Sequence, residues 1–414
     1  MNGIHREVLP NGLTILIQEK EVYSTAIAVG VRFGSAYHPL AHFIGHMLFK
    51  GTKSRTHQDI NREAIKGGGS MDDITDLYST IYFIKAVSGL SYQALDLLCD
   101  MIANSTFSPK ELEYEKLVIN EEIMGRSEEP GVILKGLFYK NLYNDNKFSA
   151  AINQSQEFLN DLSREQIFDV YRQFYVPERL VFAIVGKVNK EKTLKIIKKY
   201  FGRLKGGVLV PLDQRSGKPI TEAKRIIIRK GGLKHAHLMI GFKIPAIDHP
   251  DYYPLIVLQT IIAGDIGSRL YEQLREKRGL LYNIIAKLDY SVGQYGTLRL
   301  YTNFSPNNLY TVETIIKNEL EKLGKRGASE EELKIAKSRL IHERQLKLEG
   351  TFQHARLLVE TELNNQLKEI QRFNVNIRKV KIKDVRRVAR LYCNLNKSVT
   401  VILKPHINTQ KMPL

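Results

Sequence analysis

Two histidines four residues apart form the first candidate site in this sequence. His42 and His46 lie in the segment "AHFIGHMLFKGT", residues 41–52, whose apolar residues are typical of a buried helix. Positions i and i+4 lie on the same face of a helix, so both imidazoles can bind one zinc ion. A third ligand is needed, and a later helical segment, "YEKLVINEEIMG", offers three carboxylates: Glu115, Glu121 and Glu122. The sequence therefore predicts a zinc site built from two helices.

The composition restricts the kind of protein that carries this site. Of 414 residues, 43% are hydrophobic and 26% are charged, as in ordinary globular proteins. The only cysteines, Cys99 and Cys393, are far apart, which excludes a disulfide framework and a cysteine metal cluster. No apolar run approaches the roughly 18–20 residues that cross a bilayer, and the N-terminal residues lack a signal-peptide pattern. We therefore expect a cytoplasmic protein without membrane partners.

The net charge of +18 comes from 62 lysines and arginines against 44 aspartates and glutamates. Such an excess can attract nucleic acid. Here the basic residues are spread along the chain, and no recognisable nucleic-acid-binding module accompanies them. We expect no nucleic-acid partner.

The two halves of the sequence resemble each other. Residues 79–102 and 296–320 each contain a threonine-led alternating strand, a turn and an amphipathic helix, and Thr80 aligns with Thr297 at an offset of 217 residues. Residues 108–122 align with 329–343 at an offset of 221, and both segments begin with serine followed by acidic residues, as at a helix start. The sequence therefore predicts an internal duplication.

This duplication predicts an α+β fold of two similar domains. We place them at residues 1–205 and 220–414, joined by a linker at 206–219 that is rich in glycine, proline and serine. Each domain is expected to hold a mostly antiparallel sheet with helices packed on one face. Each is long enough to bury its own core.

The segments "HFIGHMLFKGT", "GGGSMDD" and "LDLLCDMIANSTFSPKELEYEKLVINEE" together resemble the pitrilysin/insulinase family of inverted zinc metallopeptidases, in particular its mitochondrial-processing-peptidase-like and short bacterial members. That family carries the motif H-x-x-E-H and a distal glutamate about 76 residues further on, a spacing that selects Glu122 here. The resemblance implies one Zn²⁺ held by His42, His46 and Glu122, with Glu121 as the near alternative. It also implies that Glu115 supports a ligand from behind.

The resemblance extends into the C-terminal half. The segment "GSRLYEQLREKRGLLY" contains Arg275 and Tyr282, seven residues apart, as in the family. The resemblance implies that this pair reaches the other domain's metal site and holds the substrate carbonyl, in a clam-like arrangement of the two domains. A guanidinium and a phenol are suitable donors to a developing oxyanion.

Position 45 departs from the family motif. The glutamate that activates the attacking water and carries its proton is replaced by Gly45. Loss of a positioned general base typically costs on the order of 10² to 10⁴ in rate. Glycine inside a helix also costs about 1 kcal/mol relative to alanine, and the sequence offers no packing reason for it.

Other departures surround the motif. The family's Asn-Ala pair after the double glycine is replaced by Asp72 and Asp73, either of which is a candidate substitute base. His38 lies four residues before His42 and is an alternative ligand if the helix begins early, although Pro39 favours a helix start at that point.

The sequence is consistent with two functions. The first is a zinc metalloendopeptidase that acts on unfolded peptides and is weak or inactive alone because Gly45 replaces the general base. The second is a non-catalytic peptide-binding or scaffold subunit that pairs with an active homologous chain. In either case we expect a homodimer or a heterodimer with a homologue.

Overall fold

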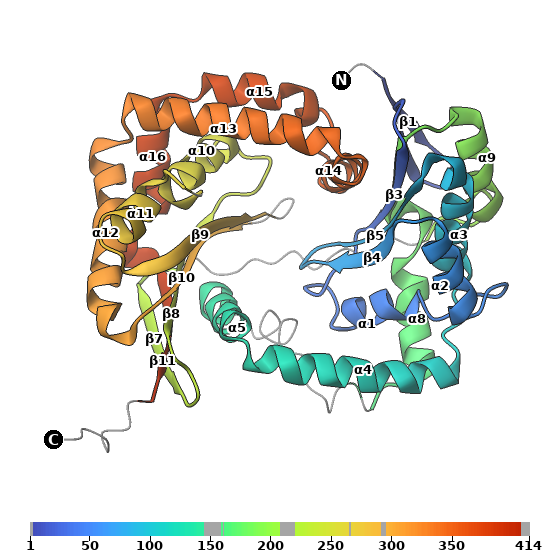
Figure 1. Cartoon of the computed structure of the whole chain (residues 1–414), viewed down its shortest axis with the longest axis horizontal. Coiled ribbons are helices and arrows are strands. Elements are labelled where there is room, and N and C mark those ends of the chain that lie inside the picture. The colour runs from blue at the N-terminus through green and yellow to red at the C-terminus, as the bar shows by residue number, and fades with distance from the viewer. Residues whose placement is uncertain are drawn as a thin grey trace. The chain divides into compact units, whose positions relative to one another are not determined.

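We analysed a computed structural model that describes residues 3–144, 159, 161–207, 220–264, 266–290 and 295–406. Most of the predicted linker, residues 208–219, lies outside these described residues. The chain divides into two compact units (Figure 1). The first unit comprises residues 1–125, 154–213 and 344–371, and the second comprises residues 126–153, 214–343 and 372–414.

The first unit is built on a six-stranded sheet with the order β1-β2-β6-β3-β5-β4. Neighbouring strands run antiparallel except β2 and β6, which are parallel. The strands are β1 (Ile4–Val8), β2 (Thr14–Glu19), β3 (Ser24–Val31), β4 (Ser70–Thr75), β5 (Thr80–Val87) and β6 (Leu180–Gly186). The accompanying helices are α1 (Leu40–Met47), α2 (His57–Lys66), α3 (Ser91–Asn104), α4 (Pro109–Glu128), α8 (Arg164–Phe174), α9 (Lys190–Phe201) and α14 (Thr351–Leu363).

The second unit repeats this layout around a five-stranded sheet with the order β7-β11-β8-β10-β9, in which only β7 and β11 are parallel. Its strands are β7 (Lys224–Lys230), β8 (Ala236–Ile244), β9 (Leu281–Asp289), β10 (Gly296–Phe304) and β11 (Val399–Pro405). Its helices are α5 (Pro130–Tyr143), α10 (Tyr252–Ala263), α11 (Arg269–Tyr271), α12 (Leu309–Arg326), α13 (Glu330–Glu349), α15 (Glu369–Lys379) and α16 (Ile382–Tyr392). The predicted α+β class with two similar domains is confirmed.

The two units exchange one helix each, relative to the expected halves 1–205 and 220–414. Helix α5 comes from the first half of the chain but packs against β8 and β11 of the second unit. Helix α14 comes from the second half but packs against β3 and β6 of the first unit. Each sheet therefore carries one helix on the face opposite its main helical layer.

A glycine marks the place where each exchanged helix crosses a central strand. A Cβ at Gly30 on β3 would lie 2.2 Å from Val359 Cγ1 of α14. A Cβ at Gly241 on β8 would lie 2.6 Å from Phe138 Cζ of α5. Both contacts are closer than atoms can approach, so the helices rest directly on the strand backbone.

The core of the first unit lies between its sheet and the helices α1, α3, α8 and α9. It is apolar and fully enclosed, with residues such as Ile27, Phe43, Leu98 and Phe182 at 0% exposure. A smaller apolar layer on the other face of the sheet joins α14 to the strands. Apolar packing on both faces of the sheet therefore holds α1 and the edge strand β4 in place. Among the described residues, no helix combines the length and apolarity that a membrane crossing requires.

Candidate metal centre

Helix α1 presents two half-buried histidines from an otherwise buried surface. Its other interior residues are apolar or glycine and are buried in the core: Leu40, Ala41, Phe43, Ile44, Gly45 and Met47. The side chains of His42 and His46 remain 17% and 25% exposed. Because they are one turn apart on the same face, their rings meet with centroids 4.6 Å apart.

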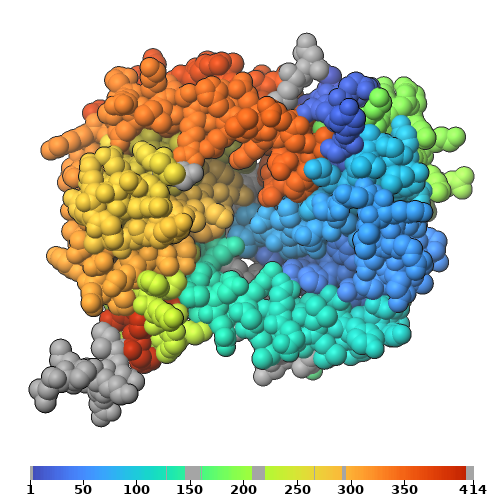
Figure 2. Space-filling view, in the orientation of Figure 1, coloured from blue at the N-terminus to red at the C-terminus, as the bar shows by residue number. Residues whose placement is uncertain are grey.

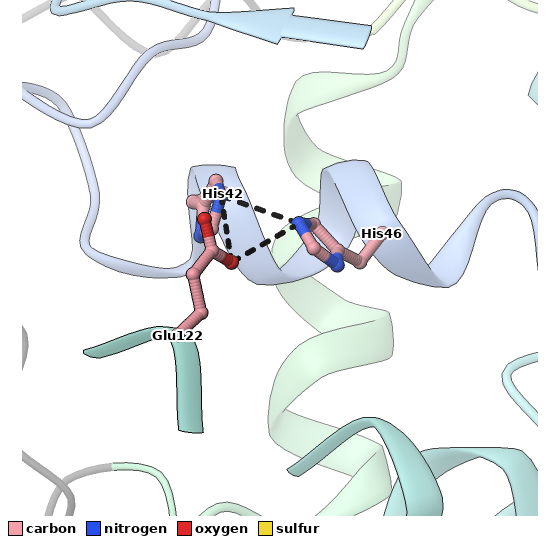
Figure 3. A group of neighbouring side chains, drawn as sticks. All are labelled: His42, His46 and Glu122. Carbon is pink, nitrogen blue, oxygen red and sulfur yellow. Dashed lines mark hydrogen bonds and ion pairs between the residues drawn. The ribbon is translucent and has the colours of Figure 1, made fainter. Parts of the chain in front are cut away.

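Helix α4 supplies the third side chain of the group. Glu115, Ile119 and Glu122 lie along one face of α4, at spacings of four and three residues, and Ile119 is fully buried. This anchoring directs Glu122 toward the two histidines (Figure 3). Part of α4 is visible at the surface of the first unit (Figure 2). Leu117, on the face opposite Glu115, is 64% exposed.

Three ligand atoms converge in a geometry that fits a zinc ion. The Nε2 atoms of His42 and His46 are 3.2 Å apart, and each lies 3.7 Å from Glu122 Oε2 (Figure 3). The centre of this triangle is about 2.1 Å from each atom, within the range of about 2.0–2.2 Å for zinc bonded to histidine or carboxylate. The donor set of two imidazoles and one carboxylate also suits zinc. The three side chains therefore fit the metal predicted from the sequence.

Glu115 supports His46 from behind. Its Oε1 lies 2.7 Å from His46 Nδ1, and its Oε2 lies 2.6 Å from Lys50 Nζ. A carboxylate that accepts the Nδ1 hydrogen of a histidine leaves Nε2 free to bind a metal. Burial favours the neutral form of Glu115, but its hydrogen bonds with His46 and Lys50 outweigh burial and lower its pKa. Glu115 is therefore ionised at neutral pH.

The same group of charges acts on His46. Burial opposes protonation of its ring, but the hydrogen bond to Glu115 and the charges of Asp73, Glu115 and Glu122 prevail, so the pKa of His46 is raised. An arrangement that favours positive charge on a histidine also favours a cation beside it. The local field is thus suited to a metal ion.

Three of the alternative site residues lie elsewhere. Glu121 is exposed on α4 and does not belong to the converging group. His38 precedes α1, and its Nδ1 accepts a hydrogen bond of 3.1 Å from the main-chain N–H of Leu40. Asp72 is exposed on β4, on the side of the strand opposite to its neighbour Asp73.

Gly45 lies against Asp73 of the edge strand β4. A Cβ at position 45 would be 3.0 Å from Asp73 Oδ2 and 3.4 Å from Thr75 Oγ1. A Cβ there would require this carboxylate to move by a few tenths of an ångström, and a longer side chain would compete with it for the same space. This competition is a packing reason for glycine that the sequence did not reveal. Burial raises the pKa of Asp73 to about 6, against the lowering effects of His46 and of the hydrogen bond from Thr75.

Arg275 and Tyr282 form a contact within the second unit. Arg275 lies in a π-helical turn, Glu272–Glu276, and its Nη1 donates a hydrogen bond of 2.9 Å to the main-chain oxygen of Tyr282. Its guanidinium also lies over the rings of Tyr271 and Tyr282, at 4.9 and 4.6 Å from their centroids. Tyr282 itself is 78% exposed, so its hydroxyl is available to a ligand.

Comparisons with known proteins identify a family of zinc peptidases. Residues 14–156 match the family model described as "Insulinase (Peptidase family M16)", and residues 161–340 match "Peptidase M16 inactive domain". An uncharacterised zinc protease of Bacillus subtilis is 30% identical over 84% of this chain and 85% of its own. One of Mycobacterium leprae is 27% identical over 99% of this chain and 94% of its own.

Solved structures show the same fold. The crystal structure of a protease from Helicobacter pylori matches with a TM-score of 0.90 and 23% identity, over 97% of this chain and 99% of that one. A structure from Pseudomonas fluorescens, described as a peptidase M16 inactive domain, matches with a TM-score of 0.88 and 18% identity, over 99% of this chain and 100% of that one. The fold of the two units is therefore one that known proteins share over nearly their whole length.

Proposed function

Because this chain belongs to the insulinase family of zinc peptidases, peptidase family M16, we propose that it is a zinc-dependent endopeptidase that cuts unfolded peptides. The convergence of His42, His46 and Glu122 within bonding distance of a common centre carries the proposal. When bound, zinc supplies Lewis-acid chemistry, which makes water more acidic and polarises a peptide carbonyl.

The chain's own residues prepare this centre in advance. Glu115 holds the tautomer and orientation of His46, and Lys50 balances the buried charge of Glu115. The apolar packing of α1 fixes the backbone on which both histidines stand. Rigid support of this kind keeps ligands within the small tolerance that a metal site requires.

The edge strand β4 offers a place for the substrate. It lies at the end of the sheet of the first unit, so one side of its main chain is not paired with another strand of that sheet. An extended peptide can add to such an edge through main-chain hydrogen bonds. Because Asp73 of β4 lies against Gly45 of α1, a peptide on this edge passes close to the metal ligands. This mode requires an unfolded substrate.

Arg275 and Tyr282 are the donors that we assign to the carbonyl oxygen of the substrate, within one chain or from a second copy or homologue in a dimer. Arg275 is oriented by its hydrogen bond to Tyr282 and by two aromatic rings. A guanidinium and an exposed phenol held together in this way can stabilise negative charge that develops on an oxygen.

A second candidate function is a non-catalytic, peptide-binding subunit of a heterodimer with an active homologue. Gly45 favours this reading, because α1 provides no carboxylate to move protons. Without any replacement, the rate is expected to fall by about 10² to 10⁴.

Zinc content and peptide cleavage separate these functions. The full chain is purified in zinc and dialysed, its zinc content is measured, and unstructured fluorogenic peptides are added with and without a chelator. The proposal predicts about one zinc per chain and slow cleavage that the chelator abolishes and zinc restores. Bound zinc without any cleavage supports the non-catalytic subunit. Less than about one-tenth zinc per chain contradicts both the ligand assignment and the peptidase.

A further inference from the structure

We infer that Asp73, on strand β4, supplies the carboxylate that helix α1 lacks, and that it acts as general base and then general acid in peptide cleavage. This inference rests on the proposed function. In this interpretation the carboxylate that is missing from position 45 of α1 is supplied by the neighbouring strand β4.

The Asp73 carboxylate lies close to position 45 of α1. Positions 42, 45 and 46 lie on one face of α1, so the side chain of residue 45 would project beside both histidines. Asp73 Oδ2 lies 3.0 Å from the place where the Cβ of residue 45 would be. A glutamate's own carboxylate oxygens lie about 3–3.5 Å from its Cβ. An oxygen of Asp73 is thus at the same reach from the helix as the expected glutamate.

The side chains of residues 45 and 73 compete for the same space. A Cβ at position 45 with Asp73 present meets its Oδ2 at 3.0 Å and its Cγ at 3.4 Å. The family that this sequence resembles has a large residue at 45 and alanine at 73. This chain has the smallest residue at 45 and a carboxylate at 73. The carboxylate is therefore carried by the strand in place of the helix.

A hydrogen bond within β4 orients the Asp73 carboxylate. Thr75 Oγ1 donates a hydrogen bond of 3.0 Å to Asp73 Oδ2, from two residues further along the same face of β4. Asp73 is partly exposed, and its charge acts on His46 of the proposed metal centre. Among the described residues, Asp73 Oδ1 accepts no hydrogen bond. That oxygen is available to a water molecule.

The proposed step balances as an ordinary hydrolysis. Asp73 takes a proton from the water whose oxygen forms the new bond to the peptide carbon. The carbon–nitrogen bond then breaks with its electron pair on nitrogen, and Asp73 returns the proton to that nitrogen. The products are a carboxylic acid and an amine, and Asp73 ends as it began.

A double-mutant cycle between positions 45 and 73 tests the inference. The chains compared are the wild type, Asp73→Ala, Gly45→Glu and the double variant Gly45→Glu/Asp73→Ala, each with its zinc content and folded state measured. We expect Asp73→Ala to lower cleavage by about 10² to 10⁴ with zinc content unchanged. In the Gly45→Glu background, the same Asp73→Ala change is expected to raise cleavage, because it removes a crowding like charge. This reversal of sign is the specific signature of a relocated base.

Matched variants control for charge and folding. Asp76→Ala removes an exposed carboxylate from the turn after the same strand and is expected to leave cleavage unchanged within about threefold. Asp73→Asn keeps the shape of the side chain and is expected to behave like Asp73→Ala, which separates loss of the base from loss of packing.

Each result bears on one claim. If Asp73→Ala holds zinc and cleaves as fast as the wild type, the inference is overturned and the zinc peptidase stands. If the zinc-loaded wild type is inactive and only Gly45→Glu/Asp73→Ala cleaves, Asp73 does not act as the base, and the natural chain is a non-catalytic subunit. If Asp73→Ala loses its zinc while Asp76→Ala keeps it, Asp73 serves metal binding, which also overturns the inference. If no variant holds zinc or cleaves, the proposed function falls as well.

Discussion

The two units share an order of strands and helices but differ in what lies between the corresponding helices. In the first unit, Glu115 and Glu122 of α4 meet the histidines of α1. In the second unit, an offset of 221 residues places Ala336 and Glu343 at the matching points of α13, and Glu343 accepts a hydrogen bond of 2.5 Å from Arg339. The same scaffold thus holds a metal-capable cluster in one copy and an ordinary ion pair in the other.

The segments that precede α1 in the first unit and α10 in the second unit have the same local hydrogen bond. His38 before α1 and His249 before α10 each accept a hydrogen bond at Nδ1 from a main-chain N–H two residues further on. The helix entry is therefore alike, and the chemistry differs because α1 adds two histidines whereas α10 contains none. The difference in function between the two units therefore depends on a few side chains and not on the fold that the units share.

The largest expected effect is the loss of zinc affinity when a histidine of α1 is removed. His46→Ala removes a direct ligand, so we expect zinc affinity to fall by more than about 100-fold, more than the loss of a supporting residue costs. His249→Ala removes a histidine from the second unit and is the control, which should leave zinc affinity unchanged. Competition with a fluorescent chelator measures both. An equal loss of zinc affinity in the two variants would contradict a metal site that lies in the first unit alone.

A smaller change in affinity is expected from the residue behind the ligand. Glu115→Gln keeps the size of the side chain but removes the charge that orients His46 and balances Lys50. We expect zinc affinity to fall by about 10- to 100-fold. The exposed neighbour Glu113, which pairs with Lys116, provides the control variant Glu113→Gln. An unchanged affinity in Glu115→Gln would remove the supporting role.

The helix crossings of the two units predict different responses to the same substitution. Gly30→Ala should destabilise the first unit by about 1–3 kcal/mol, because its Cβ overlaps Val359 of α14. The additional change Val359→Ala should recover part of this loss, since the overlapping atoms belong to a side chain. Gly241→Ala also meets the main-chain oxygen of Leu298 at 2.6 Å, so truncation of Phe138 should not rescue it. Urea unfolding of the four variants decides between these outcomes.

A loss of stability in acid is expected from His354 on α14, and it is spread over more than two pH units. His354 is buried at 3% exposure, and burial together with Lys20 and Arg344 lowers its pKa to about 4. An unfolded chain protonates this histidine near pH 6.5. Between these values the unfolded state binds more protons, so the stability of the folded chain falls as the pH drops from about 6.5 to 4, by on the order of 2–3 kcal/mol. His354→Phe should reduce this dependence, and an unchanged slope in urea titrations across that range would refute it.

The internal repeat and the pairing of the two histidines could be predicted from the sequence, because both depend on the local pattern of residues. The matching of Thr80 with Thr297 is confirmed by their equivalent places, in β5 and β10, beside the central strands β3 and β8. The convergence of His42 and His46 follows from helical spacing alone. These features need no knowledge of distant contacts.

The exchanged helices and the partner of Gly45 could not be predicted in this way. The apolar faces of α5 and α14 indicate burial but not which of two similar sheets covers them. The contact between Gly45 and Asp73 joins a helix to an edge strand through the tertiary fold. The pairing of a missing side chain with a carboxylate 28 positions later appears only when both are placed in space.

X-ray absorption at the zinc edge of the zinc-loaded chain reports the atoms bonded to the metal, so it shows whether His42, His46 and Glu122 hold it. We expect two imidazole nitrogens and a carboxylate oxygen at about 2.0–2.2 Å, with one imidazole lost in His46→Ala. A first shell with fewer than two imidazoles, or a spectrum unaffected by His46→Ala, would contradict the assignment of these ligands.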